Sequence, residues 1–510
     1  MSAAQVTRRG PGFVGARRRA VGFLEYAHGL GTGETGGSFT VPKAPSLREL
    51  LEALPVVADR LYLIGAPGTA WGAWSRATDL PDGWTHAARG HHLPTDSTST
   101  PSLRYTRPDG RGLELRNAAE WFGDTASVLG GWACATAWRI LGDELAALPV
   151  GGELLASPSQ TGRDLLARLL PKGHEYPILP DDVRELIRTT APQGRVELLP
   201  AARKMMPGLY ELDARTAYGA CLRALGSGLV AHDTLPELPL DARGRLTARC
   251  RLRVRVTVPA GWAHLGILSG PERPYAYPRT PGQTFTTWAD GWEVQTALDH
   301  GWHLEVLERL IFEPGAPLDT WANTLRTLVR KLEQPHPDRD ARVAGLAARA
   351  VRNLLVATVG AFAQTGYKVT RSSLDAQDIP TGVSKMLRDD DTGAWVWEER
   401  RALTGSAAAF SHPEWAAQVW GRARVRLLST PTTKAFPTPT GALHVPFAHV
   451  VALRTDALYL THRPDWPDDG EWGRYRLKGA LSKARRWPDT PAKLFTAREL
   501  GRLELGKLRG

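Results

Sequence analysis

Residues 208–218 read Gly-Leu-Tyr-Glu-Leu-Asp-Ala-Arg-Thr-Ala-Tyr, a short, mostly apolar stretch that leads into an aspartate, Asp213. The pattern over residues 208–212 predicts a strand, and a helix-like stretch over residues 215–225 follows it directly. Asp213 therefore stands at a strand end, where its carboxylate lies at one edge of a sheet. An isolated aspartate in such a place is more often a turn or cap residue than a catalytic group.

A second aspartate occupies a comparable place near the end of the chain. Residues 449–460 predict a β-hairpin with Asp456 at or beside its tip. Two carboxylates brought together at strand ends could hold two Mg²⁺ ions about 3.5–4 Å apart, as in-line phosphoryl transfer requires. The pair Asp213 and Asp456 is therefore a candidate metal and catalytic site.

A long predicted helix over residues 338–362 lies between the two aspartates in sequence. It carries Arg342, Arg349 and Arg352 at spacings of seven and three, which places them broadly on one face. A solvated basic face is the simpler interpretation. The functional one is a helix that grips a triphosphate through arginine, while Gly360 allows a base pair to approach closely.

Composition describes a soluble chain of several domains. The 510 residues are 42% hydrophobic and 23% charged, and no run of about 18 uninterrupted apolar residues predicts a membrane span. The net charge of +11 suits a polyanionic partner such as nucleic acid, although an arginine-rich proteome would give the same balance. Three widely spaced cysteines form no metal or disulfide pattern, so we expect a reducing cytoplasm.

Three segments resemble the motifs of family B DNA polymerases, in the order that the family has them. Residues 213–218 resemble the first palm motif, Asp-x-x-Ser-Leu-Tyr-Pro, and residues 352–363 resemble the fingers motif. Residues 455–458 resemble the end of the second palm motif, Tyr-x-Asp-Thr-Asp-Ser-Leu. The most similar subgroup is that of the small protein-primed polymerases of phages and linear plasmids, whose extra insertion would match roughly residues 226–285.

The resemblance implies an α/β (α+β) fold of the right-hand type, with a palm, fingers and a short thumb behind a degenerate RNase H-like exonuclease domain. The implied segments are a basic flexible arm (1–20), the exonuclease-like domain (21–205), a first palm segment (206–317), fingers (318–368), a second palm segment (369–470) and the thumb (471–510).

The resemblance also implies roles for single residues. Asp213 and Asp456 would bind two Mg²⁺ ions, for which Mn²⁺ could substitute. The incoming dNTP would meet Tyr218 under its sugar and Arg352, Arg349 and Gly360 on the fingers helix. Primer-template DNA would contact Lys478, Arg476 and Arg422, and residues 478–510 support this with nine Lys and Arg against three Asp and Glu. A terminal protein or another replication protein would be a further partner.

Several positions depart from the family pattern. Arg454 stands where the family has the first aspartate of Asp-Thr-Asp, and Val359 replaces the tyrosine before Gly360. Arg352 replaces a lysine but keeps the positive charge. We expect Arg454 to weaken metal binding by charge repulsion.

The exonuclease-like segment lacks most of the carboxylates that a two-metal nuclease needs. Glu25 stands at the first motif, residues 65–69 offer neither Asn nor Asp at the second, and Asp124 is a candidate for the third. The sequence therefore predicts a DNA polymerase without proofreading. Two alternatives stay open, namely a catalytically inactive polymerase-like replication factor that binds nucleic acid, and a nuclease or unrelated metal phosphotransferase.

Overall fold

The computed structural model forms two compact units, Met1–His174 with Thr320–Thr358, and Glu175–Asp319 with Val359–Gly510. The structure describes residues 20–54, 58–87, 101–170, 175–203, 205–206, 209–241, 244–246, 249–272, 275–381, 383, 386–388, 393, 395–403, 406–434, 436–468, 470–481 and 485–486. Residues 1–19 of the predicted basic arm and residues 482–484 and 487–510 of the predicted thumb lie outside these ranges.

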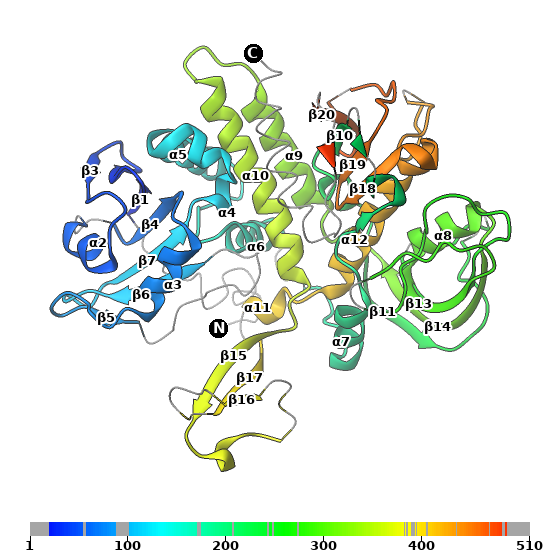
Figure 1. Ribbon diagram of the computed structural model, residues 1–510, viewed down its shortest axis with the longest axis horizontal. Helices are drawn as coiled ribbons and strands as arrows, with labels where there is room; N and C mark the ends of the chain where they lie inside the picture. The colour runs from blue at the N-terminus through cyan, green and yellow to red at the C-terminus, as the bar shows by residue number, and fades with distance from the viewer. Residues whose placement is uncertain are drawn as a thin grey trace. The chain divides into compact units, whose positions relative to one another are not determined.

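Within the described residues, the first unit contains one seven-stranded sheet in the order β3-β2-β1-β4-β7-β6-β5 (Figure 1). Its centre is parallel, since β1 pairs with β4 and β4 with β7, and the remaining pairs are antiparallel. The strands are β1 (Val21–Glu25), β2 (Leu30–Gly33), β3 (Ser38–Thr40), β4 (Arg60–Ile64), β5 (Thr85–His86), β6 (Ser102–Thr106) and β7 (Gly112–Asn117).

Aromatic side chains join the sheet of the first unit to two of its helices, α4 (Ala119–Phe122) and α5 (Thr125–Ala146). Phe23 stacks on Tyr62, whose neighbour Trp138 meets Trp121 edge-on. The helices are α2 (Leu47–Ala53), α3 (Gly68–Arg76), α4 (Ala119–Phe122), α5 (Thr125–Ala146), α6 (Pro158–Leu169), α9 (Asp319–Glu333) and most of α10 (Ala341–Phe362).

The second unit carries the elements of the two aspartates. In the part of the chain that the structure describes, five antiparallel strands follow the order β20-β10-β19-β18-β8 and four follow the order β11-β14-β12-β13. The first set is β8 (Val196–Leu198), β10 (Leu209–Ala214), β18 (Val450–Arg454), β19 (Ala457–Leu460) and β20 (Tyr475–Leu481). The second is β11 (Gly226–Asp233), β12 (Cys250–Thr257), β13 (Thr284–Asp290) and β14 (His303–Pro314).

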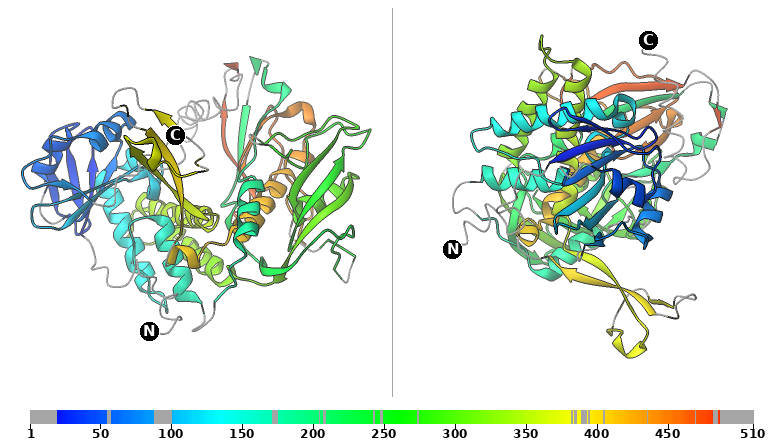
Figure 2. Two further views of the ribbon diagram at one scale, coloured as in Figure 1. Left: turned by 90° about the horizontal axis from the view of Figure 1, so that it is seen from below. Right: turned by 90° about the vertical axis from the view of Figure 1, so that its left-hand side faces the viewer.

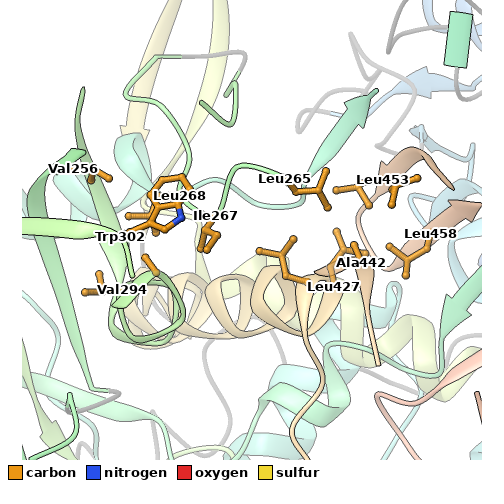
Figure 3. Close-up of a cluster of buried hydrophobic side chains, with 14 of the residues drawn as sticks. Val256, Leu265, Ile267, Leu268, Val294, Trp302, Leu427, Ala442, Leu453 and Leu458 are labelled. Atoms are coloured by element: carbon orange, nitrogen blue, oxygen red, sulfur yellow. The ribbon is translucent and has the colours of Figure 1, made fainter. Parts of the chain in front are cut away.

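One hydrophobic core joins these two sheets. Leu427, near the end of α12 (Pro413–Leu428), lies beside Leu453 and Leu458 of the aspartate hairpin (Figure 3). The same core continues to Val294 on α8 (Gly291–Asp299) and to Trp302, the residue before β14. Burial of this apolar set fixes the register of the five-stranded sheet, because a slip of one residue would turn Leu458 to the opposite face.

Three smaller parts complete the second unit. The helix α7 (Asp181–Thr190) packs against α12, and α11 (Ser406–Ala409) directly precedes α12 in sequence. The short strand β9 (Met205–Met206) pairs with β21 (Arg485–Arg486). The strands β15 (Gly366–Ser373), β17 (Trp395–Ala402) and β16 (Met386–Arg388) form a separate sheet, visible in Figure 2. No sequence pattern predicted this sheet, most of which falls in the predicted second palm segment.

Most predicted elements are confirmed, including the strands around Asp213, the hairpin around Asp456 and the long helix α10. The predicted helix over residues 215–225 is wrong, since turns and a short 3₁₀ helix, Gly219–Cys221, replace it. The Arg215 backbone instead exchanges hydrogen bonds with residues 473–474, and Thr216 adopts a positive φ of 44°.

One helix, α10, is long and apolar enough to cross a membrane by length and composition alone. Of the 18-residue apolar stretch within this helix, 61% is buried inside the protein. Asn353 of α10 donates a hydrogen bond to the Trp121 carbonyl, and Thr358 packs on Gly162 of α6. The helix is therefore packed into the protein along most of its apolar stretch.

Candidate functional site

The sheet brings Asp213 and Asp456 to the same edge. Strand β10 runs antiparallel to β19, with Asp213 opposite Ala457, the residue that follows Asp456. The Ala214 amide donates a hydrogen bond of 2.9 Å to the Asp456 carbonyl, which ties the tip of the hairpin to the end of β10. Burial raises the pKa of the Tyr475 phenol, and the carboxylates of Asp456 and Asp213 raise it further. Both aspartates therefore act on one buried side chain.

The turn that carries Asp456 is held from its other side by residues 194–196. Thr455 has a positive φ of 54°, an unfavourable backbone conformation for a β-branched residue. Its amide donates a hydrogen bond of 2.6 Å to the Arg195 carbonyl. Gly194 allows this approach, since a Cβ there would lie only 3.0 Å from Thr455 Oγ1.

Arg195 is itself fixed by buried contacts. Its side chain is fully buried, its Nη1 donates to the Gly266 carbonyl at 2.7 Å and its Nε donates to Glu197 at 2.9 Å. The guanidinium also lies 3.9 Å from the centre of the Tyr277 ring. Sequence reasoning missed Gly194 and Arg195, and a glycine just before a short strand was the only local signal.

Two predicted DNA-binding residues lie directly on Asp213. Lys478 Nζ is 2.9 Å from Asp213 Oδ1, and Arg476 Nη2 is 3.5 Å from Asp213 Oδ2. Both cations come from β20, which pairs with β10 on the side away from β19. Asp213 is only 7% exposed, so these cations compensate a carboxylate that is largely removed from water.

Tyr218 lies near the second aspartate. Burial raises the pKa of its phenol, and the charge of Asp456 raises it further. Tyr218 follows the turn after β10, and Gly219 beside it leaves room for the Trp472 ring, which a Cβ there would meet at 2.5 Å. The structure thus places Tyr218 close enough to Asp456 to feel its charge, and the role of Tyr218 under the sugar of a nucleotide stays a prediction.

The carboxylate pair suits a hard divalent cation. Mg²⁺ binds through oxygen, commonly to one or two carboxylates together with water and substrate phosphates. Among the residues that the structure describes, no three His, Cys, Asp or Glu side chains are grouped to hold a metal ion. Asp213 and Asp456 supply carboxylate oxygens of the kind that such a cation takes, and their role as metal ligands stays a prediction. Arg454, opposite Ala457 and 9% exposed, brings the cation that the sequence identifies as a departure.

Arg422 lies elsewhere and is used inside the fold. It is buried on α12, donates hydrogen bonds to the carbonyls of Cys221 and Ala224, and lies 4.9 Å from the centre of the Trp292 ring. Burial lowers the pKa of Arg422 to about 10. These contacts hold the segment after Tyr218 in place, and the predicted contact of Arg422 with DNA stays a prediction.

The predicted nucleotide-binding arginines belong to the first unit. Arg352 forms an ion pair with Glu333 of α9, and Arg349 is exposed, with its guanidinium near Gly123. Gly360 is exposed, and a Cβ there would meet no other atom within 4 Å. An open surface at Gly360 is what close approach of a base pair requires, but the roles of these three residues stay predictions.

The exonuclease-like residues are not assembled as a carboxylate cluster in the described ranges. Glu25, at the end of β1, accepts a hydrogen bond of 2.7 Å from the Gly131 amide, where α5 is interrupted by the positive φ of Gly130. Asp124 is exposed just before α5, and Gly65 follows β4 with a positive φ of 73°. Glu25 thus serves the backbone of α5.

Comparison with solved structures shows what this architecture resembles. Phi29 DNA polymerase complexed with primer-template DNA matches with a TM-score of 0.57 and 11% identity, over 91% of this chain and 85% of that chain. The complex of phi29 DNA polymerase with single-stranded DNA matches at 0.55 and 12% identity over the same shares. The chain has a polymerase-like fold. No protein-family model and no curated protein matches it.

Proposed function

We propose that this chain is a DNA-directed DNA polymerase that adds dNTPs to the 3′-hydroxyl of a primer by two-metal phosphoryl transfer. The observation that carries the proposal is the junction of Asp213 and Asp456 through the 2.9 Å hydrogen bond from Ala214 to Asp456. The polymerase-like fold supports the proposal independently. A soluble, basic chain also suits a DNA primer-template as partner.

Asp213 and Asp456 would hold the metal ions, with Mg²⁺ as the expected cofactor. When bound, such ions activate the primer hydroxyl and neutralise charge on the pyrophosphate. Lys478, 2.9 Å from Asp213, would release that carboxylate and turn its ammonium toward a backbone phosphate of the primer. Arg476, on the same strand, would likewise turn from Asp213 to a backbone phosphate of the primer.

Tyr218 would lie under the sugar of the incoming nucleotide, where its ring leaves no space for a 2′-hydroxyl. Arg352 and Arg349 would bind the triphosphate, and Arg352 would exchange Glu333 for phosphate oxygens. The sequence resemblance favours the protein-primed subgroup, in which a terminal protein would be the partner. Glu25 and Asp124 would not support proofreading, because two carboxylates cannot position two metals and a water.

Primer extension tests the proposal directly. The purified chain is incubated with a labelled primer-template, Mg²⁺ and dNTPs, and we expect elongation to the end of the template. A second candidate, a catalytically inactive DNA-binding factor, is favoured by the three cations Arg454, Arg476 and Lys478 around the aspartates. DNA binding without elongation in either Mg²⁺ or Mn²⁺ would select that candidate over the polymerase.

A further inference from the structure

Glu211 is a third carboxylate beside the proposed site. It precedes Asp213 by two residues on β10, so both side chains lie on the same face of the sheet. It is 5% exposed, and the Tyr459 hydroxyl of the neighbouring strand donates to its Oε1 at 3.3 Å. Sequence reasoning passed over Glu211, because a lone glutamate in a predicted strand carries no motif.

One ammonium serves both carboxylates. Lys478 Nζ lies 2.9 Å from Asp213 Oδ1 and 3.4 Å from Glu211 Oε1. The pairing of β10 with β20 shifts at this point, since Glu211 lies opposite Gly479 and Leu212 lies opposite Leu477. Lys478 is therefore the extra residue of a β-bulge, a feature that redirects a side chain. The bulge presents the ammonium to the two acids.

We propose that Glu211 is a positioning residue that shares Lys478 with Asp213 and so keeps Asp213 available to a divalent cation. The inference rests on the proposed function. A lysine paired with Asp213 alone would compete fully with a metal ion for the same oxygens. Glu211 draws part of that charge to itself and adds a negative charge close to the metal position.

Glu211 also compensates for a carboxylate that is missing from the hairpin of the site. Arg454 stands on the hairpin where the resemblance expects a carboxylate, so the hairpin contributes Asp456 and a cation in place of two acids. Glu211 and Asp213 are the two carboxylates beside Lys478, and Arg476 lies 3.5 Å from Asp213. Without Glu211 the positive charges would outnumber the negative ones, which disfavours a divalent cation.

Mn²⁺ binding to the full-length chain, followed by the electron paramagnetic resonance signal of free Mn²⁺, tests this inference without DNA and without turnover. The variants are Glu211→Gln, Lys478→Gln and the double variant, each measured with and without dATP. We expect Glu211→Gln to weaken Mn²⁺ binding about three- to tenfold and Lys478→Gln to strengthen it by a similar factor. In the Lys478→Gln background, Glu211→Gln should cost clearly less, because no lysine is left to share.

Glu308→Gln is the matched control, since this carboxylate also contacts basic side chains on a sheet of the second unit, at 2.8 Å from His232 and 3.5 Å from Arg253. It should leave Mn²⁺ affinity unchanged. Thermal unfolding distinguishes a role in metal binding from a purely structural role. In the second case, Glu211→Gln would lower the melting midpoint and leave the Mn²⁺ affinity unchanged. Folded Glu211→Gln with unchanged or tighter Mn²⁺ binding overturns the inference alone. Wild-type chain that binds no Mn²⁺, or binding that survives Asp213→Asn, overturns the proposed metal site as well.

Discussion

Gly194→Ala adds a single methyl group against the turn that carries Asp456. The new Cβ would lie 3.0 Å from Thr455 Oγ1 and 3.2 Å from its Cγ2, closer than ordinary van der Waals contact. Thr455 cannot yield easily, because its amide is bonded to the Arg195 carbonyl and Arg454 before it is paired with Val196. The turn must therefore shift by a few tenths of an ångström.

Misplacement by about 1 Å can cost roughly 100-fold in rate, so a shift of a few tenths predicts a loss of about three- to tenfold in kcat. The free energy of unfolding should fall by less than about 1.5 kcal/mol, because the change is one methylene-sized group. Steady-state extension of a primer-template by one nucleotide measures kcat and KM. The expected result is a lower kcat with DNA affinity unchanged.

Gly261→Ala is the matched control for this variant. Gly261 lies in the same unit, and a Cβ there would meet no other atom within 4 Å. It should therefore keep the wild-type rate. Wild-type kcat in Gly194→Ala, or an equal loss in both variants, would refute the claim that residues 194–196 hold the catalytic turn.

Three further predictions concern the sugar, the nuclease-like unit and the core. Tyr218→Val should raise ribonucleotide incorporation relative to dNTP incorporation by at least about tenfold, since the clash with the 2′-hydroxyl is gone; an unchanged ratio in an active variant removes Tyr218 from the site. The wild-type chain should not shorten a labelled single-stranded oligonucleotide in Mg²⁺ or Mn²⁺ without dNTPs, and shortening that Asp124→Ala abolishes would contradict this. Arg424→Met should destabilise the second unit by about 3–5 kcal/mol in urea unfolding, because it leaves Glu293, 2.7 Å away and 3% exposed, without this cation. Arg255→Met, which breaks an exposed pair with Glu305, should cost only about 0–1 kcal/mol, and equal losses would argue against the buried network.

The sequence predicts the local parts of this site well. Asp213 lies near the end of one short strand and Asp456 follows another, and such strands are recognisable from a few consecutive residues. The fold then joins them, because both strands bury Leu212 and Leu458 in one core. The prediction that the two aspartates share a sheet edge therefore follows from local pattern and hydrophobic burial.

Contacts between segments that are distant in the chain could not be predicted from the sequence. The segment after Asp213 reads as a helix, but its backbone hydrogen bonds go to residues 473–474, and local propensity cannot anticipate such partners. The support of Thr455 by Arg195 has the same character. The pairing of Lys478 with Glu211 depends on a bulge in β20, and bulges leave no dependable mark on the alternation of side chains.

The most direct test of the central claim is primer extension by Asp213→Asn and Asp456→Asn, with DNA binding measured in parallel by fluorescence anisotropy. Each substitution removes one carboxylate charge and keeps the side-chain shape. The account predicts that nucleotide incorporation falls by about three orders of magnitude or more in each variant, while affinity for the primer-template stays close to that of the wild type. Incorporation that persists in either variant, or equal loss of incorporation and DNA binding, would contradict the assignment of these aspartates as metal-binding catalytic residues.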